Sequence, residues 1–157
     1  MTTRSIARAA LLIKRDLTLG TLMDRLAQVH GGRALVAETE GGLVLTYEQA
    51  AKRVRRWAGG IAARTEPGDV VVVATSNGYE QLLLCCAASR AGAIPAPVND
   101  QMSKDEIAHV VRDSGATLVL RSAIEVDRAE PQRHACPSAP GDVAALFYTS
   151  GTTGKPK

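Results

Sequence analysis

The last ten residues, YTSGTTGKPK from Tyr148 to Lys157, bring small, hydroxyl-bearing and basic side chains into one short run. Glycine allows tight turns in which consecutive backbone N–H groups point to one side, and the neighbouring hydroxyls and ammonium add further donors. Such a set of donors suits a polyphosphate. The residues predicted to bind it are Thr149, Ser150, Gly151, Thr152, Thr153, Gly154 and Lys155.

Two commoner phosphate-binding signatures do not fit this run. A Walker A loop has four residues between its glycines and a Ser or Thr after its lysine. Here two threonines separate the glycines, and Pro156 follows Lys155. The proline biases Lys155 toward an extended conformation, which argues against a helix beginning there. No G-x-G-x-x-G sequence is present either, so a dinucleotide-binding fold has no support.

From Phe147 to Lys157 the run resembles the phosphate-binding motif of the acyl-adenylate-forming superfamily, which includes acyl-CoA synthetases, adenylation domains of peptide synthetases and luciferases. Other landmarks of the N-terminal region of this family occur upstream in the expected order, so the resemblance extends from about residue 17 to residue 157. These landmarks are Leu45–Glu48, Gly68–Val73 followed by Asn77, Arg90–Asn99 and Pro140–Ala144.

The resemblance implies an ATP-dependent acid–CoA ligase, in which a carboxylate and ATP give an acyl-adenylate and pyrophosphate, and the acyl group then passes to CoA. It implies ATP, Mg²⁺ and CoA as cofactors, with a fatty acid as the expected substrate. Residues 149–154 would clamp the nucleotide phosphates, and Lys155 would add positive charge. Whether Thr149 also contributes an oxygen to Mg²⁺ is left open. No residue of this chain is assigned a catalytic or metal-binding role, because those elements of the family follow the loop.

By the same resemblance, residues 17–157 are expected to form an incomplete N-terminal portion of an AMP-binding domain. Two interpretations remain: a fragment of a ligase that is inactive alone, or a non-catalytic remnant or interaction module. For either, we expect no ATP–pyrophosphate exchange, since the terminal carboxylate lies close to the loop. We also expect the open edge of the sheet to favour self-association.

Composition sets further bounds. At 157 residues, 45% hydrophobic and 22% charged, the chain is long enough for one core. A net charge of +3 and an aromatic content of 3% argue against nucleic-acid binding. Cys85 and Cys86 lie in an apolar run, where free cysteine acts as a small buried hydrophobe, and a reducing cytoplasm fits them. Residues 1–16 are expected to be flexible or helical; their apolar run is shorter than the roughly 20 residues of a membrane span.

The elements that must position the loop follow from hydrophobic periodicity and capping signals. Short apolar runs without alternation predict buried parallel strands, and the chain is therefore expected to have an α/β fold of alternating helices and mostly parallel strands. Capping boxes at Thr46, Asn77 and Ser103 mark three helix starts. The predicted helices are 19–30, 47–64, 79–91 and 104–114, the strands are 70–74, 93–98, 117–120 and 144–149, and 35–38 with 43–46 form a hairpin.

The strand Ala144–Thr149 would place the phosphate-binding loop at its carboxyl end, where open α/β sheets bind ligands. Residues 122–142, which include three prolines, are expected to be a surface connection. A basic cluster on the second helix, at positions 52, 53, 55 and 56, is interpreted as the solvated face of that helix, and Trp57 as a core residue.

Overall fold

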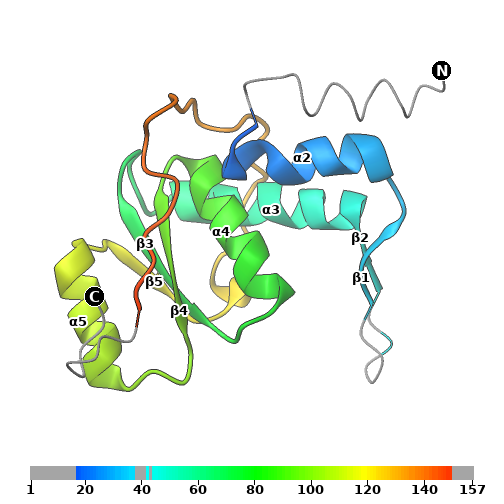
Figure 1. The fold of residues 1–157 in the computed structure, drawn as a ribbon. Helices are drawn as coiled ribbons and strands as arrows, with labels where there is room; N and C mark the ends of the chain where they lie inside the picture. The colour runs from blue at the N-terminus through cyan, green and yellow to red at the C-terminus, as the bar shows by residue number, and fades with distance from the viewer. Residues whose placement is uncertain (1–16, 38–41, 43, 150–157) are drawn as a thin grey trace.

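The computed structural model describes residues 17–37, 42 and 44–149. In this part of the chain, helices and strands alternate as the sequence predicts (Figure 1). Their order is α2 (Leu19–His30), β1 (Ala34–Ala37), β2 (Val44–Thr46), α3 (Tyr47–Ala62), β3 (Val70–Thr75), α4 (Tyr79–Ala91), β4 (Ile94–Asn99), α5 (Lys104–Ser114), β5 (Leu118–Leu120) and the short 3₁₀ helix η1 (Ala123–Glu125). The predicted α/β fold is confirmed.

The central sheet has the strand order β4-β3-β5, and both pairings are parallel. Alternate residues of β3 face opposite layers: Val71 and Val73 pack with α3 and α4, whereas Val72 and Ala74 pack with α5. All four of these residues are buried, and this explains why the strand is a continuous apolar run in the sequence. The predicted hairpin of β1 and β2 is also confirmed, as a separate antiparallel pair.

Two of the three predicted capping boxes are confirmed. The Thr46 and Ser103 side chains each accept a hydrogen bond from the backbone N–H three residues on. In return, the side chains of Gln49 and Glu106 accept a hydrogen bond from the backbone N–H of the cap residue. The box predicted at Asn77 is wrong, because Gly78 is the N-cap of α4 and no side chain caps it. Glu80 instead accepts a hydrogen bond from the backbone N–H of Ala123, at 2.9 Å. The carboxylate therefore joins α4 to the start of η1.

The predicted surface connection at 122–142 is wrong in part. Ala123 and Val126 belong to the main core, at 5% and 2% exposure. Further on, the backbone carbonyls of Gln132 and Arg133 accept hydrogen bonds from the Arg90 guanidinium, at 3.0 and 2.6 Å. The first part of this segment covers one end of α3 and α4. Only its later part, 137–144, is exposed throughout.

Arg90 lies at the centre of this packing. Its side chain is 1% exposed and pairs with Asp24 of α2 at 2.8 Å, while Gly20 contributes a backbone carbonyl at 3.3 Å. A buried guanidinium is tolerated when its donors are paired, and here carbonyls and one carboxylate supply the acceptors. The contact joins α2, α4 and the segment at 132–133.

The predicted strand Ala144–Thr149 is not a strand in the structure. The segment does reach the sheet, since the Leu146 N–H donates to the Pro95 carbonyl of β4 at 2.9 Å. In β4, the Ile94 N–H bonds to Asp69 beside β3, so the N and O atoms of residues 95 and 97 point to the outer edge. Both residues are prolines and have no N–H to donate. A ladder between β4 and this segment can therefore form only half of its hydrogen bonds.

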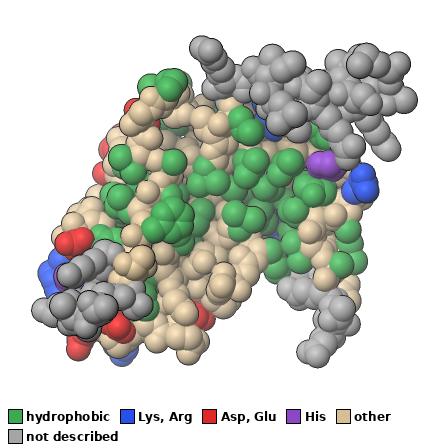
Figure 2. Space-filling view, in the orientation of Figure 1, with side chains coloured by type: hydrophobic (Ala, Val, Ile, Leu, Met, Phe, Trp, Pro, Cys, Tyr) green, Lys and Arg blue, Asp and Glu red, His purple; other side chains and the backbone are tan. Residues whose placement is uncertain are grey.

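The same prolines bear on the expected self-association. An edge strand without donors at alternate positions is a poor template for pairing with another chain. Self-association through this edge stays a prediction. Apolar side chains do reach the surface elsewhere: Figure 2 shows them gathered on the face that carries α4, and Leu82 of α4 is 48% exposed.

Candidate functional site and its relatives

The described part of the predicted phosphate-binding loop is its first residue, Thr149, which is exposed. The six other predicted site residues, Ser150, Gly151, Thr152, Thr153, Gly154 and Lys155, lie outside the described residues. The structure describes the segment that leads into the loop, residues 143–149, which we call the approach segment. In Figure 1 this segment descends from the loop above the sheet and ends beside α5.

The approach segment is held from two sides. Leu146 and Tyr148 pack against a small apolar cluster between the sheet and α5. The Tyr148 hydroxyl donates a hydrogen bond to the Asp113 carboxylate of α5, at 2.8 Å. Between these two residues, Phe147 points outward and is 75% exposed. The alternation is that of an extended chain lying on the edge of the sheet.

The electrostatics of this region keep Tyr148 a donor. Its pKa is raised, first by burial and then by the hydrogen bond and the negative charge of Asp113, while a hydrogen bond from Ser114 acts in the opposite direction. The phenol therefore remains protonated at neutral pH beside the carboxylate. Nothing in the sequence pattern indicated this pair, because Asp113 lies 35 residues away on the polar face of a predicted helix.

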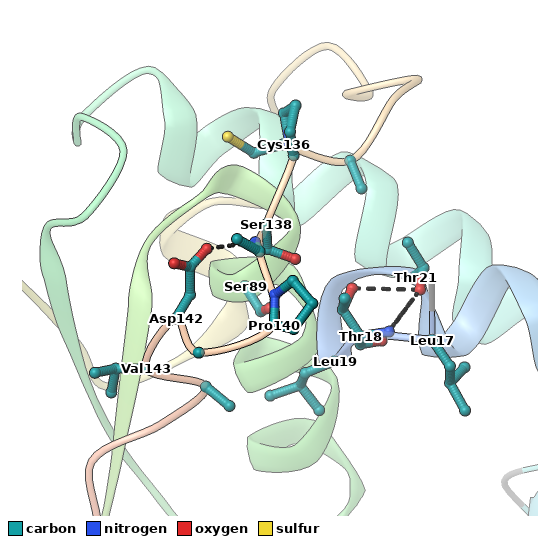
Figure 3. Close-up of a pocket in the computed structure, with 15 residues that line it drawn as sticks. Leu17, Thr18, Leu19, Thr21, Ser89, Cys136, Ser138, Pro140, Asp142 and Val143 are labelled. Carbon is teal, nitrogen blue, oxygen red and sulfur yellow. Dashed lines mark hydrogen bonds between the residues drawn. The ribbon is translucent and has the colours of Figure 1, made fainter. Parts of the chain in front are cut away.

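A hollow of about 570 Å³ opens at the other end of the approach segment (Figure 3). Its wall is formed by the start of α2, by Ser89 of α4 and by residues 135–144. No lysine, arginine or histidine is among its described lining residues, and the Asp142 carboxylate is turned back to accept a hydrogen bond from the Ala139 N–H. The described lining residues therefore offer no cation that could bind a phosphate.

Cys85, Cys86 and Trp57, whose side chains could also do chemistry, are buried parts of the core. Burial raises the pKa of Cys85 to about 11 and that of Cys86 to about 12, so both thiols stay protonated and inert. Trp57 is a core residue, as predicted, and its indole N–H donates to Asp127 at 2.8 Å. In the described ranges, no three His, Cys, Asp or Glu side chains are grouped to hold a metal ion.

The basic cluster on α3 is only partly a solvated face. Lys52 is exposed, but Arg55 forms an ion pair with Asp24 at 2.8 Å and Arg56 lies 3.8 Å from Asp127. These arginines therefore bind neighbouring elements of the same chain, and the interpretation of the whole cluster as solvated needs this correction. Across the part of the chain that is described, no helix is long and apolar enough to cross a membrane.

Solved structures share this fold. The N-terminal domain of FACL13 from Mycobacterium tuberculosis, solved with an inhibitor, superposes with a TM-score of 0.78 over 89% of this chain and 43% of that one, at 24% identity. A benzoate–CoA ligase from Burkholderia xenovorans LB400 gives a TM-score of 0.73 at 17% identity, covering 84% of this chain and 32% of the ligase. At these identities the likeness concerns the fold.

Sequence comparison gives relatives with closer identity. A feruloyl-CoA synthase from an Amycolatopsis species is 33% identical over 77% of this chain, and a 4-chlorobenzoate–CoA ligase from an Arthrobacter species is 29% identical over 80% of it. The chain spans 29% of the length of each of these two enzymes. The family model described as AMP-binding enzyme matches residues 23–157, which includes every predicted loop residue. This protein therefore belongs to the AMP-binding enzyme family, as an N-terminal portion of its adenylate-forming domain.

Proposed function

We propose that this chain supplies the ATP-phosphate clamp of an ATP-dependent acid–CoA ligase. The donor set of the loop fits a polyanion, because residues 149–155 offer four hydroxyls, backbone N–H groups of glycine and one ammonium, and contain no carboxylate. The observation that carries the proposal is the match of the family model across residues 23–157, up to and through this loop.

The clamp acts on charge. When the carboxylate of the substrate attacks the α-phosphorus, negative charge grows on the departing pyrophosphate. Donors that are fixed around that charge stabilise the transition state more than the ground state. In this scheme Thr149, Ser150, Thr152 and Thr153 hydrogen-bond the phosphate oxygens, and Lys155 balances their charge. Mg²⁺ would supply further positive charge, and CoA would accept the acyl group.

The identity of the acid is a separate proposal. The Arg90–Asn99 element resembles acyl-CoA ligases more than peptide-synthetase domains, which favoured a fatty acid. The names of two relatives, a feruloyl-CoA synthase and a 4-chlorobenzoate–CoA ligase, favour an aromatic acid instead. We propose an aromatic carboxylic acid first and a fatty acid second. A cytoplasmic location would suit ATP and CoA, and it would also suit the buried free thiols Cys85 and Cys86.

Isothermal titration of the purified chain with ATP and Mg²⁺ tests the clamp. We expect binding without turnover, and about tenfold weaker binding for Lys155→Ala, because a charge-assisted hydrogen bond is lost. Lys52→Ala is the matched control, since Lys52 is exposed on α3 and lies outside the loop. A folded chain that does not bind ATP would contradict the clamp and favour the alternative of a non-catalytic interaction module. Equal affinity for the two lysine variants would contradict the assigned role of Lys155.

A further inference from the structure

The approach to the loop is attached to the body of the protein mainly through side chains. Pro95 and Pro97 face it from the edge of β4 and have no N–H groups, so the carbonyls of the approach segment find no donors there. The hydrogen bond from Leu146 to the Pro95 carbonyl consequently has no reciprocal partner. In an ordinary parallel pair both directions would be filled. The sheet alone therefore leaves the position of Phe147 and Tyr148 weakly fixed.

The hydrogen bond between Tyr148 and Asp113 provides an attachment for the approach segment that the edge of β4 does not provide. Asp113 stands in the last turn of α5, and this helix is anchored on the sheet by Ile107 and Val110, at 4% and 0% exposure. Tyr148 packs its ring against the cluster that contains those two residues and directs its hydroxyl to the carboxylate at 2.8 Å. Tyr148 directly precedes Thr149, so this contact fixes the chain one residue before the loop begins.

We propose that Asp113 is a positioning residue, which holds Tyr148 and thereby sets where the phosphate-binding loop leaves the body of the protein. The effect on nucleotide binding rests on the proposed function, whereas the effect on the approach segment does not. Asp113 does not touch the nucleotide in this scheme. It acts through Tyr148, from an element that the sequence places far from the motif.

The variants that test this are Asp113→Ala, Tyr148→Phe and the two combined. Tyr148→Phe keeps the ring in the cluster and removes only the donor. Asp105→Ala is the matched control, because it removes an exposed carboxylate from the same helix. Two quantities are measured: the exchange rate of the Leu146 amide hydrogen by NMR, and the affinity for ATP with Mg²⁺ by titration.

We expect each single variant to speed exchange of the Leu146 amide about fivefold and to weaken ATP binding by a similar factor, as for the loss of one hydrogen bond. The double variant should be no worse than either single one, because both remove the same contact. Asp113→Ala should also lower the pKa of Tyr148, since the acceptor and its charge are both gone. Tyrosinate absorbance reports this shift after subtraction of the Tyr148→Phe titration.

The outcomes separate the two proposals. If the wild-type chain does not bind ATP, the proposed function fails, and the exchange rates alone decide the role of Asp113. If Asp113→Ala leaves both the exchange of Leu146 and the titration of Tyr148 unchanged, the positioning role is overturned. Additive effects in the double variant, or an equal effect of Asp105→Ala, would overturn it as well.

Discussion

Replacing Arg90 with methionine should be one of the most destabilising single changes in this chain. The guanidinium is 1% exposed and donates to the Asp24 carboxylate and to the backbone carbonyls of Gly20, Gln132 and Arg133, at 2.6–3.3 Å. Methionine fills much of the space of the stem but leaves the three carbonyls without the guanidinium donor and leaves Asp24 with Arg55 as its ion-pair partner. Breaking a buried charged pair costs about 3–5 kcal/mol, which is a large share of the 5–15 kcal/mol typical of a domain.

The same carboxylate provides the comparison. Asp24 also pairs with Arg55 at 2.8 Å, but the Arg55 side chain is 40% exposed. Water can replace that contact, so Arg55→Met should cost less than about 1 kcal/mol. Both arginines bind Asp24, but Arg90 is buried and also donates to three backbone carbonyls, whereas Arg55 is 40% exposed. The contrast therefore measures what burial and the carbonyl contacts together add to the ion pair.

Urea denaturation gives the free energies of unfolding. The chain has one tryptophan, Trp57, which is 4% exposed, so its fluorescence reports the core, and far-ultraviolet circular dichroism follows the helices. We expect a much lower midpoint for Arg90→Met and a nearly unchanged one for Arg55→Met. Equal losses for the two variants, or a loss below about 1 kcal/mol for Arg90→Met, would refute the account of Arg90 as the buried connection between α2, α4 and residues 132–133.

Two further predictions concern packing and thiol chemistry. Gly59→Ala should destabilise the chain by about 1–3 kcal/mol in the same assay, because the new Cβ would collide with a backbone carbonyl, while Gly32→Ala has open space and should cost far less. Cys136, which is partly exposed, should react with a thiol reagent at pH 8, whereas Cys85 and Cys86 should react only after denaturation, since their raised pKa values keep them protonated. Reaction of all three thiols in the native chain would show that the core opens readily.

The prolines of β4 explain why one predicted strand failed. The run from Ala144 to Thr149 has the composition of a buried strand, and composition is what the prediction used. A strand also needs a partner that can donate and accept, and that partner lies about fifty residues earlier in the chain. Pro95 and Pro97 have no N–H to donate, so the segment lies extended beside the sheet, with a backbone hydrogen bond from Leu146 to Pro95.

Local signals determined much of the rest. The helix starts at Thr46 and Ser103, the bounds of α5 and the buried run of β3 all depend on residues a few positions apart, and the structure has them as predicted. The predicted phosphate-binding motif is likewise a short contiguous run, and its role stays a prediction. A single sequence is sufficient for such features, because the interactions that create them are local.

The sequence by itself thus determined the family and the α/β alternation, and it predicts which residues form the phosphate-binding loop. Only the tertiary structure decided that Arg90 is buried against Asp24, that Glu80 caps η1 rather than its own helix, and that Tyr148 meets Asp113. Each of these contacts joins residues 35 or more positions apart. The charges and hydroxyls concerned look solvated in the sequence, and it is packing of the helices on the sheet that removes the water and supplies their partners.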